Sequence, residues 1–300
     1  MEPLVSIVVP NFNKGKYLED TLKSLISQTH KNIEIIIVDD GSTDNSLEIL
    51  KRYDKVDTRI KVYFNEHLGK VRSINYGMTM VKGDFVKLWG SDDYMQEYVV
   101  EKLLNEVGNA GVVAHNCLLT DENLSIINNN FIDFSEYEGK IISLEDIIEG
   151  KGFPSGLYFM RTEVANLIFP LDTNIPYEDW YMYMFLNMNN IDLKYVDTPL
   201  GMYRQVSDGA FGGVNNFDKH ITRYRNERDI KMLEYFLDLL PAEYSSLIKR
   251  RISLLTLSTK GNLLEILTSD HSIDMKSRII IKRYFFMIYY IITKLKNRGI

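Results

Sequence analysis

The chain has 300 residues, of which 45% are hydrophobic and 25% charged, a composition typical of globular proteins rather than disordered or fibrous ones. The formal net charge is −6, and residues 276–300 hold seven Lys or Arg and no Asp or Glu, so the remainder is more acidic still. An acidic body argues against nucleic acid as a partner. The single cysteine, Cys117, excludes an intrachain disulfide.

Strand and helix patterns alternate through the first third of the chain. Apolar runs rich in β-branched residues predict four buried strands, at Leu4–Val9, Ile33–Val38, Ile60–Phe64 and Phe85–Trp89. Amphipathic stretches between these runs predict helices. The alternation predicts an α/β fold with a mainly parallel central sheet flanked by helices.

Polar residues follow the predicted strands. They are Asn11 and Asn13 after Pro10, then Asp39, Asp40, Asn65, Asp92 and Asp93. Ligands of parallel α/β sheets bind at the carboxyl ends of the strands, so these side chains predict one binding site. Lys70 and Arg72, near the start of a predicted helix, are candidates for phosphate binding, although a solvated helix face explains each equally well.

Asp92 and Asp93 are the strongest candidates for a metal site. Adjacent carboxylates after a buried strand repel each other, and a divalent cation relieves that repulsion. Such a cation also stabilises a departing diphosphate. The alternative is that both residues cap a helix running from about Tyr94 to Leu104. The other polar strand ends favour the metal.

Two further acidic pairs have a structural alternative as well. Asp39 and Asp40 are suited to bind a base edge or a ribose hydroxyl, but Asp-Gly-Ser-Thr-Asp is also strong turn chemistry. In the segment Glu178-Asp179-Trp180, one carboxylate is suited to accept the proton of an attacking hydroxyl. Acidic residues are equally favourable at a helix N-terminus.

The rest of the chain divides into a mixed region and a helical region. Strand and helix patterns continue to about Val206, and after Asp218 the pattern is helical to the end. We therefore predict a catalytic domain over residues 1–215 and a C-terminal helical appendage with a basic aromatic tail over residues 216–300.

The segment SIVVPNFNKGKYLEDTLKSLISQTHKNIEIIIVDDGSTDNS resembles the start of family 2 glycosyltransferases. Two later segments, NEHLGKVRSINYGMTMVKGDFVKLWGSDD and SGLYFMRTEVANLIFPLDTNIPYEDW, are similar to further blocks of that family. The resemblance covers roughly residues 4 to 204. It implies a GT-A fold, an inverting single displacement, and a nucleotide-sugar donor bound with Mg or Mn.

The resemblance also implies roles for individual residues. Asp179 matches the catalytic base, with Glu178 and Trp180 beside it as acceptor or supporting residues. Asp92 and Asp93 match the metal and diphosphate motif. The donor-binding positions are Pro10, Asn11, Asn13, Asp39, Asp40, Lys70, Arg72, Asp92 and Arg204.

Three departures from the family pattern concern the metal and the product. Gly90 occupies the first position of the frequent Asp-x-Asp motif, and Val206 stands where the family often offers a histidine. The processive signature Gln-x-x-Arg-Trp is absent from the sequence, which favours addition of a single sugar.

We therefore expect a transferase that moves one sugar, from a UDP-sugar by family expectation, to a hydroxyl of a glycan or lipid-linked acceptor in surface polysaccharide biosynthesis. Alternatives are a sugar-phosphate nucleotidyltransferase and a non-catalytic nucleotide-sugar-binding module. The N-terminus lacks signal-peptide features, and the basic aromatic stretch 276–298 suits a membrane surface. That pattern predicts a cytoplasmic enzyme, peripheral at the inner face of the membrane. The same stretch equally suits packing on the body or on a second subunit of an oligomer.

Overall fold

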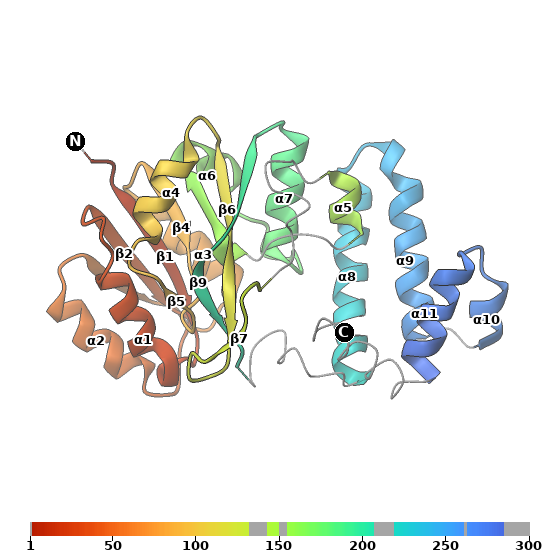
Figure 1. Cartoon of the computed structure of the whole chain (residues 1–300), viewed down its shortest axis with the longest axis horizontal. Helices are drawn as coiled ribbons and strands as arrows, with labels where there is room; N and C mark the ends of the chain where they lie inside the picture. The colour runs from red at the N-terminus through yellow and green to blue at the C-terminus, as the bar shows by residue number, and fades with distance from the viewer. Residues whose placement is uncertain (1, 132–142, 150–154, 207–218, 261–262, 285–300) are drawn as a thin grey trace. The chain divides into compact units, whose positions relative to one another are not determined.

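The computed structural model describes residues 2–131, 143–149, 155–206, 219–260 and 263–284 (Figure 1). The chain forms two compact units. The first comprises Met1–Ile147 and Lys151–Ser207, and the second comprises Ile148–Gly150 and Asp208–Ile300.

One sheet forms the centre of the first unit. In the described residues it has nine strands: β1 (Val5–Asn11), β2 (Ile33–Asp39), β3 (Ile60–Phe64), β4 (Phe85–Leu88), β5 (Tyr94–Met95), β6 (Val112–Thr120), β7 (Ile126–Asn128), β8 (Tyr158–Arg161) and β9 (Leu193–Arg204). The order is β3-β2-β1-β4-β8-β6-β9-β5, with β7 paired to β6.

The four strands predicted from the sequence lie together in this sheet. β3, β2, β1 and β4 are parallel, so their carboxyl ends lie along one edge. The register pairs Asn11 with Asp39, which brings the last residues of β1 and β2 side by side. β8 is antiparallel to both β4 and β6, and β6 is parallel to β9.

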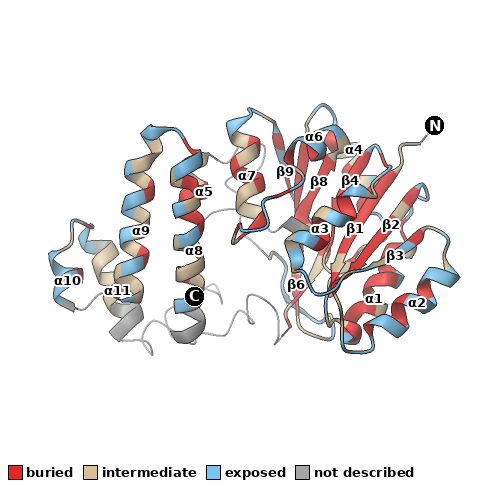
Figure 2. Cartoon of the chain, turned by 180° about the vertical axis from the view of Figure 1, so that it is seen from behind, coloured by how far each residue is buried: buried red, intermediate tan, exposed pale blue. Residues whose placement is uncertain are grey.

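Helices cover both faces of the sheet, as the parallel topology requires. In the first unit they are α1 (Gly15–Ile26), α2 (Ser46–Val56), α3 (Lys70–Thr79), α4 (Val99–Val107), α6 (Thr162–Ile168) and α7 (Glu178–Met188). α4 lies before the sheet in Figure 1 and α3 before it in Figure 2, where the central strands are almost wholly buried. The α/β fold with a mainly parallel sheet is thus confirmed.

The helix predicted directly after the aspartate pair begins later in the structure than the sequence pattern indicates. A helix from Tyr94 to Leu104 is wrong at its start, because Tyr94 and Met95 form β5 and α4 begins at Val99. Met95 is fully buried and pairs with Gly201 of β9. This long-range pairing outweighs the local helical pattern.

The second unit is helical in its described part. It contains α8 (Lys219–Leu239), α9 (Ser245–Thr259), α10 (Leu263–Thr268) and α11 (Ile273–Tyr284), and α5 (Leu144–Ile148) lies at the unit boundary in sequence. α8 contacts α9 and buries Leu233 and Phe236. Within the described ranges, no helix combines the length and apolarity needed to cross a bilayer. Residues 285–298 of the predicted membrane-surface stretch lie outside the described residues.

Gly77 tests the close packing of α3 on β1. A Cβ atom at this position would lie 2.6 Å from Cγ1 of Val8. Gly77→Ala should therefore lower the free energy of unfolding by about 1–3 kcal/mol, although alanine is the better helix former. Thr79→Ala, on the exposed side of the same helix, should change it by no more than about 0.5 kcal/mol. Urea unfolding that ranks the two variants equally would contradict this packing.

Candidate functional site

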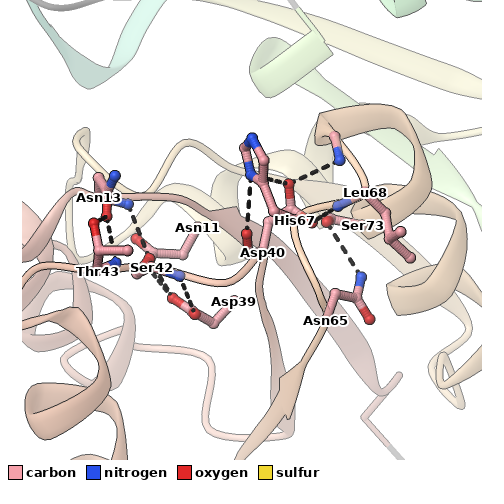
Figure 3. Close-up of polar contacts among 11 residues, drawn as sticks. Asn11, Asn13, Asp39, Asp40, Ser42, Thr43, Asn65, His67, Leu68 and Ser73 are labelled. Carbon is pink, nitrogen blue, oxygen red and sulfur yellow. Dashed lines mark hydrogen bonds and ion pairs between the residues drawn. The ribbon is translucent and has the colours of Figure 1, made fainter.

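The turn after β2 is built around the Asp39 carboxylate (Figure 3). Asn11 Nδ2 donates to Asp39 Oδ2 at 2.7 Å. Ser42 donates both its backbone N–H and its hydroxyl to the same carboxylate, at 2.9 and 2.7 Å. Asp39 is 2% exposed, and its carboxylate accepts hydrogen bonds within the turn, as the turn interpretation of the sequence predicts. Asn11 Oδ1 is buried and has no hydrogen-bond partner among the described residues.

Asn13 joins the loop after β1 to the turn after β2. Its backbone N–H donates to Ser42 Oγ at 2.9 Å, and its Oδ1 accepts from the Thr43 N–H at 2.8 Å (Figure 3). Asn13 adopts a φ of 50°, a left-handed conformation that asparagine tolerates better than most residues. Pro10 pairs with Val38 one step earlier in the register.

Asp40 holds the loop between β3 and α3. Its carboxylate accepts the backbone N–H groups of Leu68 and Gly69, at 2.7 and 2.8 Å (Figure 3). Gly69 has a φ of +95°, which a residue with a side chain would adopt only under strain. The two adjacent aspartates therefore organise two different loops at the same edge of the sheet.

An aromatic platform, not predicted from the sequence, joins these loops. The rings of Phe12 and His67 stack with centroids 4.3 Å apart and planes inclined by 28°. Phe12 nevertheless remains 40% exposed. A flat, exposed pair of rings beside a buried polar cluster is suited to stack on a planar ligand such as a nucleobase.

Asp92 and Asp93 have separate partners. Asp92 Oδ2 lies 3.1 Å from Lys14 Nζ. Asp93 Oδ1 accepts the backbone N–H of Arg204 at 2.9 Å. Burial, reinforced by the charge of Asp92, raises the pKa of the Asp93 carboxyl to about 8. Since the chain enters β5 directly afterwards, neither residue caps a helix.

Asp92 and Asp93 place two carboxylates at this position, so a divalent cation here would need further ligands from its substrate or from water. No group of three or more His, Cys, Asp or Glu side chains suited to a metal occurs in the described parts of the chain. Mg²⁺ commonly uses one or two protein carboxylates and takes its other ligands from phosphate and water. Gly90 adds no carboxylate, and a Cβ atom there would collide with the Asp93 carboxylate.

Arg204 and Val206 contribute from the end of β9. The Arg204 side chain is 1% exposed, ion-paired with Asp20 Oδ2 at 3.2 Å, and stacked over the Tyr17 ring at 4.8 Å. The main-chain N–H of Arg204 donates to Asp93, whereas its guanidinium contacts Asp20 and Tyr17. Val206 is buried and apolar, and offers no metal ligand.

The first turn of α7 brings the second acidic pair to the site. Glu178 forms an ion pair with Lys70 at the start of α3, 108 residues earlier in the chain. Asp179 Oδ1 accepts the Trp180 N–H at 2.9 Å. Burial and the neighbouring Glu178 charge raise the pKa of Asp179 to about 7, against the opposing effect of Lys70.

Most predicted site residues thus belong to one connected region of the first unit. Arg72 is the exception, because it is exposed and no hydrogen bond or ion pair among the described residues joins it to the others. Lys14, Ser42, Phe12 and His67 were not predicted. Their residue types are common in loops, and their roles depend on contacts between loops.

Two solved structures share the overall arrangement and define its class. A mannosyltransferase, PcManGT of Pyrobaculum calidifontis in complex with GDP-Man and Mn²⁺, matches 99% of this chain and 87% of its own, with a TM-score of 0.63 and 13% identity. Residues 1–349 of S. aureus TarS in complex with UDP match 93% and 78%, with a TM-score of 0.57 and 19% identity. The fold is GT-A, the fold of nucleotide-diphospho-sugar transferases.

Sequence relatives narrow the class to a family. The profile of glycosyl transferase family 2 matches residues 6–154. An uncharacterized glycosyltransferase of Haemophilus influenzae is 30% identical over 189 residues, 61% of this chain and 71% of its own. The putative glycosyltransferase EpsH of Bacillus subtilis is 31% identical over 209 residues, 67% of this chain and 61% of its own. This chain belongs to glycosyl transferase family 2.

Coverage of the relatives is incomplete. The chain spans 61% of the length of EpsH and 42% of glycosyltransferase GlyG of Streptococcus pneumoniae, to which it is 34% identical over 140 residues. Membership of a glycosyltransferase family nevertheless argues against the nucleotidyltransferase alternative.

Asp40 tests how the site loops are held. Asp40→Ala removes the acceptor of two backbone N–H groups, so it should cost about 1–3 kcal/mol of unfolding free energy and speed amide exchange at Leu68 and Gly69. Asp54→Ala, at an exposed position of α2, is the matched control. Unchanged exchange at the two amides would show that Asp40 does not hold this loop.

Proposed function

We propose that this chain is an inverting glycosyltransferase that moves one sugar from a nucleotide-sugar donor to a hydroxyl of a glycan or lipid-linked acceptor. The observation that carries the proposal is the Lys70–Glu178 ion pair. It joins the helix that follows the nucleotide-side loop to the helix that carries Asp179. A base is thereby held near the ends of the strands where GT-A proteins bind their donors.

The donor's nucleoside lies, in this proposal, between the loops after β1, β2 and β3. Pro10, Asn11, Asn13, Asp39 and Asp40 form or support its cradle. The exposed ring of Phe12 stacks on the base. A UDP-sugar is the proposed donor, supported by the family resemblance and by the UDP bound to TarS.

The diphosphate lies beside Asp92, with Lys70 and Arg72 as candidate cationic contacts. Asp92 and Asp93 would hold Mn²⁺ or Mg²⁺, which stabilises the negative charge of the departing nucleoside diphosphate when bound. PcManGT supports this part of the proposal, because its complex contains Mn²⁺. Arg204 contributes by fixing Asp93 through its main-chain N–H.

Asp179 acts as the general base. The acceptor hydroxyl forms a bond to the anomeric carbon as the bond to the diphosphate breaks, and its proton passes to the Asp179 carboxylate. The nucleoside diphosphate leaves with the electron pair. Glu178 holds Lys70, and Trp180 lies beside the base on the acceptor side.

The acceptor is a surface glycan or its lipid-linked precursor. TuaG, a putative teichuronic acid biosynthesis glycosyltransferase of Bacillus subtilis that is 40% identical over 104 residues, supports this class of process. A lipid-linked acceptor requires the enzyme to work at a membrane surface, so we propose a peripheral location.

A nucleotide screen tests the donor and the cation together. UDP with Mn²⁺ should raise the melting temperature more than UDP alone, because a ligand that binds the native state stabilises it. Asp92→Asn should abolish the extra increment from Mn²⁺ while Asp54→Asn keeps it. A larger increment with GDP would change the proposed donor, and no increment with any nucleoside diphosphate would refute the donor site.

The base assignment predicts separable effects on transfer and binding. Asp179→Asn should lower the transfer rate by about 100- to 10,000-fold, since the amide cannot accept the proton, while the Kd of UDP stays nearly unchanged. Isothermal titration and a UDP-release assay measure the two quantities. Equal loss of both would remove Asp179 from the role of base.

The raised pKa of Asp179 predicts the pH dependence. The carboxyl accepts a proton only when ionised, so the rate at saturating donor should rise about tenfold per pH unit below pH 7 and level off above it. Lys70→Met removes a charge that lowers the pKa of Asp179, so it should move the midpoint to higher pH. Lys61→Met, at an exposed position of β3, should leave it in place. A flat profile between pH 5 and 8 would contradict the assignment.

A further inference from the structure

Lys87 is a fully buried lysine inside the sheet. It lies on β4, the strand that leads to Gly90 and the aspartate pair, and its exposed surface is 0%. Burying an ammonium group is unfavourable unless all its N–H donors are satisfied. A methionine or leucine would fill the same volume without this requirement, so the lysine needs an explanation beyond packing.

Lys87 Nζ is satisfied by three acceptors, none of them a carboxylate. It donates to the carbonyl of Gly156 at 2.6 Å and to that of Tyr158 at 3.4 Å, and it lies 2.9 Å from His115 Nε2. His115 Nδ1 lies 2.7 Å from the Asn116 carbonyl. If Nδ1 carries the proton and donates to that carbonyl, Nε2 is free to accept from the lysine. The Trp89 ring, 4.9 Å from Nζ, lines the remaining side.

The shortest of these contacts, to the Gly156 carbonyl, reaches the turn η2 (Ser155–Leu157), which directly precedes β8. η2 contacts both β4 and α7. A Cβ atom on Gly156 would lie 3.9 Å from the Gly90 nitrogen, so the turn sits against the start of the Gly90–Asp93 segment. The Tyr158 ring packs on Tyr183 of α7 with centroids 5.6 Å apart.

We propose that Lys87 is a positioning residue that fixes η2, and through it α7, against the Gly90–Asp93 end of β4. It touches neither donor nor acceptor. Its side chain sets the spacing between the aspartate pair and Asp179, and this consequence for the reaction rests on the proposed function. The hydrogen bonds to main-chain carbonyls explain why a donor-bearing side chain occupies the site.

Three variants separate positioning from packing. Lys87→Met keeps the length and removes every N–H donor. Lys87→Gln retains two donors without the charge. Lys61→Met makes the same chemical change at an exposed position of β3 and serves as the matched control.

Hydrogen–deuterium exchange of the full chain with UDP reads out the position of η2 and α7 without requiring transfer. In Lys87→Met, amides of η2 and of α7 should exchange at least about tenfold faster, while those of β1 and β2 keep their protection. Lys87→Gln should recover part of the protection, and Lys61→Met should match the wild type. Wild-type exchange in Lys87→Met would overturn the proposal, as would equal loss of protection throughout the sheet in both Lys87 variants.

Kinetics with UDP-GlcNAc, followed by UDP release, test the consequence for the reaction. Lys87→Met should lower kcat by about 100-fold with the donor KM within about twofold of the wild type, because misplacing a base affects the chemical step more than binding. A proportional rise in KM with unchanged kcat would contradict positioning. Faster exchange at η2 and α7 together with an inactive wild type would instead refute the proposed function and leave the positioning role intact.

Discussion

The accumulation of negative charge at one edge of a parallel sheet is the constraint on which the rest of the site depends. Because β1, β2 and β4 are parallel, Asp39, Asp40, Asp92 and Asp93 all lie at that edge. Carboxylates so placed repel one another unless donors or cations separate them. Backbone N–H groups from two loops and from the end of β9 donate to these carboxylates, and the ammonium group of Lys14 lies beside Asp92.

This arrangement divides the aspartates by task. Asp39 accepts a hydrogen bond from Ser42, and Asp40 accepts hydrogen bonds from Leu68 and Gly69. These two aspartates therefore stabilise the loops in which their donors lie. Among the described residues, Asp92 lies beside the Lys14 ammonium group and Asp93 accepts the Arg204 N–H. Carboxylates that remain incompletely satisfied inside a protein are the ones suited to bind a cation or to titrate.

The sequence predicted what depends on local pattern and on strand direction. Buried β-branched runs located β1 to β4, and parallel pairing then brought Asn11 next to Asp39. Contacts between segments that are distant in the sequence could not be predicted from local patterns. Nothing local in Tyr94 and Met95 indicates pairing with β9, and nothing around Lys70 indicates a partner 108 residues away.

The burial and the partners of individual side chains could not be predicted from the sequence either. Lys87 follows an apolar residue in a strand, and a lysine at such a position ordinarily points to solvent. Its burial depends on acceptors from β6, η2 and β8 that come together only in the folded sheet. The Phe12–His67 stack depends in the same way on the loop after β1 and the loop between β3 and α3, which meet only in the folded protein.

The hydrogen bonds from the loop before α3 to the Asp40 carboxylate have a thermodynamic consequence. A loop whose backbone N–H groups are already held, and whose Gly69 already has the required left-handed conformation, loses little conformational entropy when a ligand arrives. Preorganisation of this kind makes more of the contact energy available as affinity. The same bonds limit how far the loop adapts, so a ligand bound on this side of the proposed site would have to fit an existing shape.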